Sequence, residues 1–187
     1  TFELRLITEL ISNNYKGENT TGINPIQVGF KTKICNQKRF LPTTSFIAHI
    51  AIPDAATKKF SATYYAPNFR FTMQHTLTNN ISLGYNLGAE WDGNKAEPTF
   101  IYTLTTGFSI TKKLGAYIEL YGFAPQNSKS NHNADGGFTY FVNSNTLIDL
   151  SGGYGITENA NHDYFSLGFS IRLPNKQSWM FNLLKKN

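Results

Sequence analysis

The stretches ISLGYNLGAEW (Ile81–Trp91) and TFIYTLTTGFSIT (Thr99–Thr111) form the clearest pair of alternating segments in the chain. In the first, every second residue is apolar or aromatic, and those between are Ser82, Gly84, Asn86, Gly88 and Glu90. A period of two places successive side chains on opposite faces of a β-strand. Each stretch matches the roughly 9 to 11 residues with which a tilted strand crosses a bilayer. The pair predicts two membrane-crossing strands, each with one apolar and one polar face.

The alternation recurs along the chain and predicts an all-β fold. The predicted strands are Phe2–Ile11, Ile26–Ile34, Thr43–Ile52, Phe69–Leu77, Ile81–Trp91, Thr99–Thr111, Leu114–Phe123, Gly136–Val142, Leu147–Ile156 and Asp163–Leu173. Short turns alternate with mostly longer loops between them, and Ser12–Pro25 and Ala124–Ala134 are among the loops. Ser61–Tyr65 extends the fourth strand, interrupted at Pro67. This order predicts an antiparallel up-and-down transmembrane β-barrel with ten visible strands, its turns periplasmic and its loops outside.

Composition narrows the alternatives. Charged residues make up 16% of the chain, below the quarter or so that is typical of soluble domains, while hydrophobic residues make up 40%. No run of eighteen apolar residues is present, which excludes a helical membrane span. The net charge of +5 is spread over loops and turns, so nucleic acid is not an expected partner. Cys35 is the only cysteine, so no internal disulfide can form.

Ionisable and polar side chains fall on the face opposite the apolar one. A charge facing lipid at the bilayer midplane costs about 2 to 4 kcal/mol, so this face must point into the lumen. Ten strands enclose a tube only slightly wider than the eight-stranded kind that side chains fill, which predicts a narrow charged lumen. These groups form either a stiffening network of ion pairs or a polar path for a small solute. The predicted lumen-lining residues are Glu3, Arg5, Glu9, Lys31, Lys33, His49, Arg70, Gln74, Glu90, Glu119, Asp149 and Arg172.

Aromatic residues gather on the apolar face at the loop ends of the strands. Outer-membrane barrels carry aromatic girdles at their interfaces with lipid headgroups, and a soluble sandwich gives no reason for this clustering. The predicted girdle residues are Tyr65, Phe69, Trp91, Phe100, Tyr102 and Phe165.

Catalytic and metal chemistry find no support in the sequence. His75 lies on the outward face, but the neighbouring strands offer no outward serine beside it, so a lipid hydrolase is not expected. His49 points inward at the opposite end, and His132 and His162 lie in loops without suitably spaced ligands. We therefore expect no enzyme, no metal and no cofactor.

Seven motifs occur in order along most of the chain and carry a resemblance to a known family. They are APNFRFTMQHTL (Ala66–Leu77), SLGYNLGAEWDG (Ser82–Gly93), EPTFIYTLTTGFS (Glu97–Ser109), YGFAP (Tyr121–Pro125), DGGFTY (Asp135–Tyr140), LSGGYG (Leu150–Gly155) and LGFSIRLP (Leu167–Pro174). Together they resemble the phenol meta-pathway (MetA-like) outer-membrane protein family, in particular its Bacteroidetes members, which are usually labelled transporters. The resemblance implies an envelope barrel, of twelve strands at full length with two ahead of Thr1. It carries over no catalytic motif.

The barrel is predicted to span residues 1–174, followed by a periplasmic tail over residues 175–187 that is amphipathic or disordered. Two functions stay open. The first is a small-solute channel or transporter of the bacterial outer membrane. The second is a non-conducting accessory or scaffold subunit of a larger envelope complex. Outer-membrane lipid is an expected partner in both, and the loops or the tail could bind other envelope proteins. A soluble lipocalin-like barrel is a third reading, with the leucines inside and Glu90 outside.

Overall fold

A computed structural model describes residues 2–15, 18–160 and 163–173 of the protein. The predicted tail over residues 175–187 and His162 lie outside this range. The described residues contain no helix long and apolar enough to cross a membrane. Their regular structure consists of β1 (Phe2–Ile7), β2 (Leu10–Tyr15), β3 (Glu18–Ile23), β4 (Gln27–Cys35), β5 (Thr43–Ala51), β6 (Ala66–Thr76), β7 (Ile81–Glu90), β8 (Thr99–Ser109), β9 (Leu114–Pro125), β10 (Asn131–Asn143), β11 (Thr146–Gly155) and β12 (Tyr164–Ile171).

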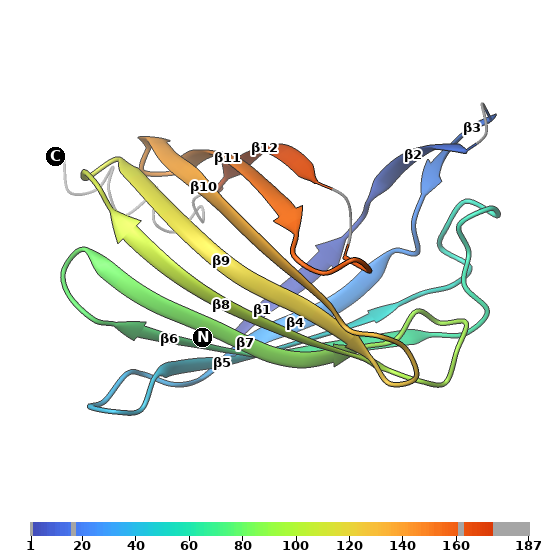
Figure 1. The fold of residues 1–187 in the computed structure, drawn as a ribbon, viewed down its shortest axis with the longest axis horizontal. Helices are drawn as coiled ribbons and strands as arrows, with labels where there is room; N and C mark the ends of the chain where they lie inside the picture. The colour runs from blue at the N-terminus through green and yellow to red at the C-terminus, as the bar shows by residue number, and fades with distance from the viewer. Residues whose placement is uncertain (1, 16–17, 161–162, 174–187) are drawn as a thin grey trace, which may run out of the picture.

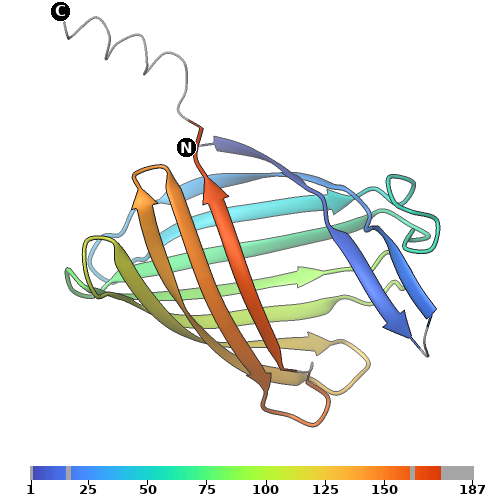
Figure 2. The same cartoon turned by 90° about the horizontal axis from the view of Figure 1, so that it is seen from above.

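Ten of these strands form one antiparallel sheet, in the order β1-β4-β5-β6-β7-β8-β9-β10-β11-β12. The sheet curls around an interior (Figure 1). Short connections lie at one end of the strands, the turn end, and longer ones at the other, the loop end (Figure 2). Within the described residues β1 and β12 are the two edges and are not paired with each other. The predicted antiparallel up-and-down β-barrel fold with ten strands is confirmed.

The first predicted strand is wrong beyond Ile7. The chain leaves the main sheet after β1, and the following residues pair with β3 in a separate two-stranded hairpin. The prediction of Ser12–Pro25 as a loop is wrong for the same reason. This hairpin is rich in Asn and Thr, and its apolar residues do not alternate with polar ones. Its sequence therefore lacks the pattern by which the other strands were predicted. It projects from the loop end of the sheet (Figures 1 and 2).

Two other predicted boundaries need correction. β10 begins at Asn131 instead of Gly136, because Asn131 to Asp135 pair with the loop-end half of β9. Ser61–Tyr65 does not extend the fourth strand. The amides of Thr63 and Tyr64 donate to the Gly93 carbonyl at 3.1 and 2.8 Å, which ties this segment to the next loop instead of to the sheet. Pro67 lies within β6, opposite Ile50 of β5.

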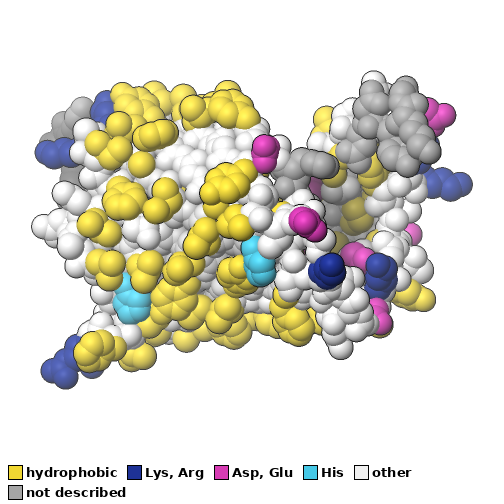
Figure 3. All heavy atoms as spheres, viewed as in Figure 1, with side chains coloured by type: hydrophobic (Ala, Val, Ile, Leu, Met, Phe, Trp, Pro, Cys, Tyr) yellow, Lys and Arg dark blue, Asp and Glu magenta, His cyan; other side chains and the backbone are white. Residues whose placement is uncertain are grey.

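Large apolar side chains are concentrated on the outer surface of the sheet. In β12, Phe165, Leu167, Phe169 and Ile171 are 59% to 76% exposed, and the residues between them are serines and a glycine. Few apolar side chains of the described residues are buried, Ala66, Ala89 and Ile101 among them. One face of the molecule shows apolar side chains over the strands and most charged ones at the ends (Figure 3). The protein thus lacks the dry centre of a soluble barrel, and its apolar surface faces outward.

Candidate solute path

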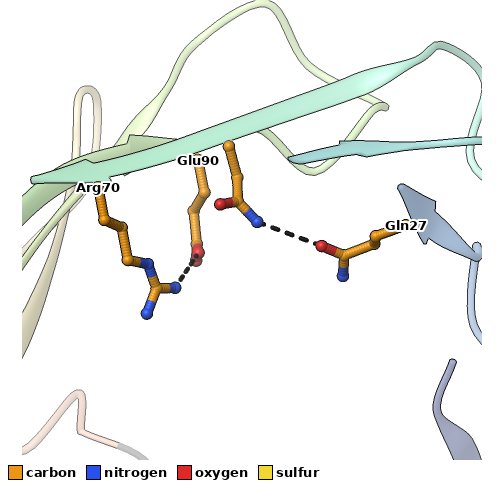
Figure 4. Close-up of polar contacts among 4 residues, drawn as sticks. Gln27, Arg70 and Glu90 are labelled. Atoms are coloured by element: carbon orange, nitrogen blue, oxygen red, sulfur yellow. Dashed lines mark hydrogen bonds and ion pairs between the residues drawn. The ribbon is translucent and has the colours of Figure 1, made fainter. Parts of the chain in front are cut away.

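Arg70 of β6 and Glu90 of β7 form an ion pair on the concave side of the sheet, with Arg70 Nη2 3.2 Å from Glu90 Oε2 (Figure 4). Both side chains are about a third exposed, at 39% and 32%. Gly88 lies directly opposite Arg70, and a Cβ at Gly88 would stand 2.9 Å from Arg70 Cγ. The glycine therefore leaves room for the arginine stem to cross toward Glu90.

A second ion pair lies on β1. Arg5 Nε is 3.8 Å from Glu3 Oε1, and Lys31 of β4 is the cross-strand partner of Glu3. These two pairs are the only ion pairs among the described residues. The interior charges therefore do not form the extended ion-pair network that was one reading of the sequence.

A cavity of about 560 Å³ opens on the inner face near the turn ends of β4, β5 and β6. Its charged lining comes from Glu3, Lys31 and Lys33, and Lys33 Nζ donates to Asn36 Oδ1 at 3.2 Å. The remaining polar lining consists of Thr43, Ser45, Thr72, Gln74, Asn86 and Thr105. This cavity brings together four of the predicted lumen residues.

A second cavity of about 220 Å³ lies toward the loop ends of β9 and β12. Arg70 and Glu119 line it from the predicted set, with the aromatic side chains of Tyr121 and Phe123 beside them. Asn86 lines both cavities and donates from Nδ2 to Thr103 Oγ1 at 2.6 Å. The two cavities therefore adjoin along one wall.

Asp135 and Tyr164 also line this second cavity, and sequence reasoning missed both. Tyr164 Oη donates to Asp135 Oδ2 at 2.6 Å, and the Thr105 hydroxyl donates to Glu119. Asp135 is the cross-strand partner of Glu119, so two carboxylates lie directly opposite each other. Asp135 fell between a predicted loop and a predicted strand. Tyr164 alternates with outward Phe165, a signal that could have assigned it to the inner face.

Other predicted lumen residues lie apart from the cavities. Glu9 falls between β1 and β2, where Glu9 Oε2 accepts a hydrogen bond from Asn24 Nδ2 at 3.0 Å. Arg172 lies beyond β12 at the turn end, and its backbone amide donates to the Asn145 carbonyl. Asp149 pairs with Gly168, and His49 pairs with Gly29. The ring nitrogens of His49 have no hydrogen-bond partner among the described residues.

The predicted girdle residues lie on the outer surface, and some make specific contacts. Phe69 and Trp91 have ring centroids 6.4 Å apart, and Trp91 Nε1 donates to the Ala96 carbonyl at 3.0 Å. Tyr102 packs over Gly122 and shares a 2.6 Å hydrogen bond with Nδ1 of His132, a residue of β10 and not of a loop. The remaining three are at least half exposed: Tyr65, in the loop before β6, Phe100 and Phe165.

A metal ion needs several histidine, cysteine or acidic side chains close together. The described residues contain no group of three or more His, Cys, Asp or Glu side chains arranged to hold a metal ion. His75 Nε2 lies 3.3 Å from the Tyr85 hydroxyl, on the outer surface near the turn end.

Comparison with known proteins places the chain in a family. A solved structure described as "NanC porin structure in rhombohedral crystal form" superposes with a TM-score of 0.61 at 10% identity, covering 92% of this chain and 97% of that one. This likeness establishes the fold. No curated protein matches. Residues 2–173 match the family described as "Putative MetA-pathway of phenol degradation", which confirms the family that the sequence motifs resemble but not its Bacteroidetes members in particular. The chain belongs to this family of phenol-degradation MetA-pathway proteins.

Proposed function

We propose that this protein is a non-enzymatic channel in the bacterial outer membrane that passes small solutes through a narrow, charged lumen. The observation that carries the proposal is the division of the sheet into two faces. Apolar side chains such as Leu167 are exposed on the outside, while ionisable groups line adjoining cavities of about 560 and 220 Å³ on the inside. An apolar exterior of this kind is what hydrocarbon requires, and a polar interior is what a solute path requires.

Lipid is then the immediate partner of the outer surface. The family and the porin fold support an outer-membrane location, and they fit transport better than catalysis. No substrate follows from the family description itself.

Conductance of the full chain across a planar lipid bilayer tests the proposal. We expect stepwise currents that depend on the salt and that fall when an added solute occupies the lumen. A protein that is folded and inserted in the bilayer, yet silent over the full voltage range, would overturn it.

The second candidate is a non-conducting accessory subunit. It is supported by the β2–β3 hairpin, which projects from the loop end beyond the main sheet (Figure 2). A silent protein that co-purifies with one envelope protein, and loses it when the hairpin is shortened, would favour this candidate.

A further inference from the structure

The charges of the sheet divide between its two halves. Strands β1 and β4 to β7 carry four cationic side chains against two carboxylates, a difference of +2: Arg5, Lys31, Lys33 and Arg70 against Glu3 and Glu90. Strands β8 to β12 carry three carboxylates and neither Lys nor Arg: Glu119, Asp135 and Asp149. We call these two halves the basic wall and the acidic wall.

The two walls face each other across the interior. The strand order places the basic wall in the first half of the curved sheet and the acidic wall in the second (Figure 2). Alternation within each strand directs these side chains to the inner face, since their neighbours along the chain include exposed residues such as Leu4 and Leu120.

Arg70 of the basic wall lines the same cavity as Glu119 and Asp135, but its ion pair is with Glu90. Glu119 and Asp135 are cross-strand partners, and like charges placed directly opposite destabilise a sheet. Their hydrogen-bond donors are the hydroxyls of Thr105 and Tyr164, which add no positive charge. Neither carboxylate takes part in an ion pair among the described residues. The wall therefore presents carboxyl groups to the lumen that no cation neutralises through an ion pair among the described residues.

The basic wall carries more cationic side chains than carboxylates. Its carboxylates are engaged by arginines, Glu3 by Arg5 and Glu90 by Arg70. Lys31 and Lys33 form no ion pair among the described residues, and Lys33 Nζ donates a hydrogen bond to the neutral Asn36 amide oxygen. Opposite charges on facing walls, with low-dielectric material behind them, focus a field across the lumen.

We propose that this crosswise field makes the lumen selective for small zwitterions, solutes that carry an ammonium and a carboxylate group together. The ammonium group turns toward Glu119 and Asp135, where Tyr121 and Phe123 add aromatic faces suited to a cation. The carboxylate group turns toward Lys31 and Lys33, which line the adjoining cavity of about 560 Å³. A solute with one charge is repelled by one of the walls, whereas a dipolar solute is attracted by both. The inference rests on the proposed channel function and names its solute class.

Liposome swelling with glycine and its uncharged isomer glycolamide tests this proposal, because the two solutes have the same atoms. After subtraction of the rates in protein-free liposomes, we expect glycine to enter several-fold faster than glycolamide. Glu119→Gln with Asp135→Asn, and separately Lys31→Gln with Lys33→Gln, should remove this preference. Both acidic-wall replacements keep an oxygen that accepts from Thr105 and Tyr164, so the fold is expected to survive.

Loop variants provide matched controls. Glu97→Gln with Glu158→Gln, and Lys58→Gln with Lys59→Gln, remove the same charges from exposed loops and should leave the glycine preference intact. A channel that passes both isomers at equal rates, or keeps its preference in the wall variants, overturns the inference and leaves the channel function standing.

Absence of swelling with either solute would instead argue against the channel. Saturation-transfer NMR of glycine and glycolamide with the detergent-solubilised protein then tests solute selectivity separately from the channel function. Glycine binding that is lost in both wall variants would support the crosswise field, and equal signals from the two isomers would overturn it.

Discussion

At the scale of single residues, Gly122 has a defined packing role on the outer surface. A Cβ at this position would lie 2.5 Å from the Tyr102 ring, which crosses Gly122 to reach His132. We predict that Gly122→Ala destabilises the folded barrel by about 1 to 3 kcal/mol, since the ring must shift and its hydrogen bond is lost. Urea titration of the protein in lipid vesicles measures this. Gly84→Ala is the control, because the nearest atom to its Cβ would be 3.9 Å away, and an equal loss there would contradict the explanation.

Asp92 organises the loop between β7 and β8. Its Oδ1 accepts from the backbone amides of Asn94 and Lys95 at 2.7 and 2.9 Å, around Gly93 with φ of +74°. The Asn94 amide, followed by that of Lys95, holds the pKa of Asp92 below its ordinary value. Because the pKa of Asp92 is lower in the folded protein, its carboxylate stabilises the loop at pH values above the ordinary Asp pKa. This stabilisation is lost as the pH falls through the lowered pKa of the folded state.

NMR titration of the Asp92 carboxyl carbon checks this, and we expect a midpoint below the ordinary Asp value of about 3.9. Asp92→Asn should leave the loop insensitive to pH over that acidic range, as reported by the Gly93 amide signal. A midpoint at or above the ordinary value would refute the proposed role of the two amides.

At the scale of elements, the β2–β3 hairpin is anchored by the loop that precedes β6. Thr57 Oγ1 accepts from the Ile23 amide at 2.9 Å, the Thr57 amide donates to the Ile23 carbonyl at 2.9 Å, and Gly22 packs against Phe60. We predict that Thr57→Val weakens this docking by about 1 kcal/mol, because the Ile23 amide loses its acceptor. Limited proteolysis should then cleave the hairpin faster. Ser61→Ala is a suitable control, since its hydroxyl bonds only within its own loop.

Strand boundaries show what local patterning can and cannot predict. Ile81–Glu90 and Thr99–Ser109 were predicted within two residues, because the apolar–polar alternation runs along each of these strands. The β2–β3 hairpin and the first residues of β10 pair outside that apolar band. These segments are mostly polar, so no alternation of apolar and polar residues marks them as strands. Only their pairing with a neighbouring strand reveals them.

At the scale of the whole molecule, the outer face is predicted to contact hydrocarbon. Leu104 of β8 is 45% exposed and lies in the middle of its strand. We expect Leu104→Arg to lower the free energy of unfolding in vesicles by about 2 to 4 kcal/mol, the cost of an arginine facing lipid near the midplane. Thr72→Arg is the matched control, because Thr72 lines the cavity of about 560 Å³ on the inner face. Equal losses in both variants would argue against the assignment of the two faces.

The sequence alone determined which residues share a face and in which order the strands follow, because a period of two is a property of the local chain. It could not determine register, which depends on pairing between distant segments. Only the tertiary structure brought Tyr164 to Asp135 and Tyr102 across Gly122 to His132. The division of charge into two walls has the same origin, since rolling the sheet places Lys31 and Glu119 on different sides of one interior.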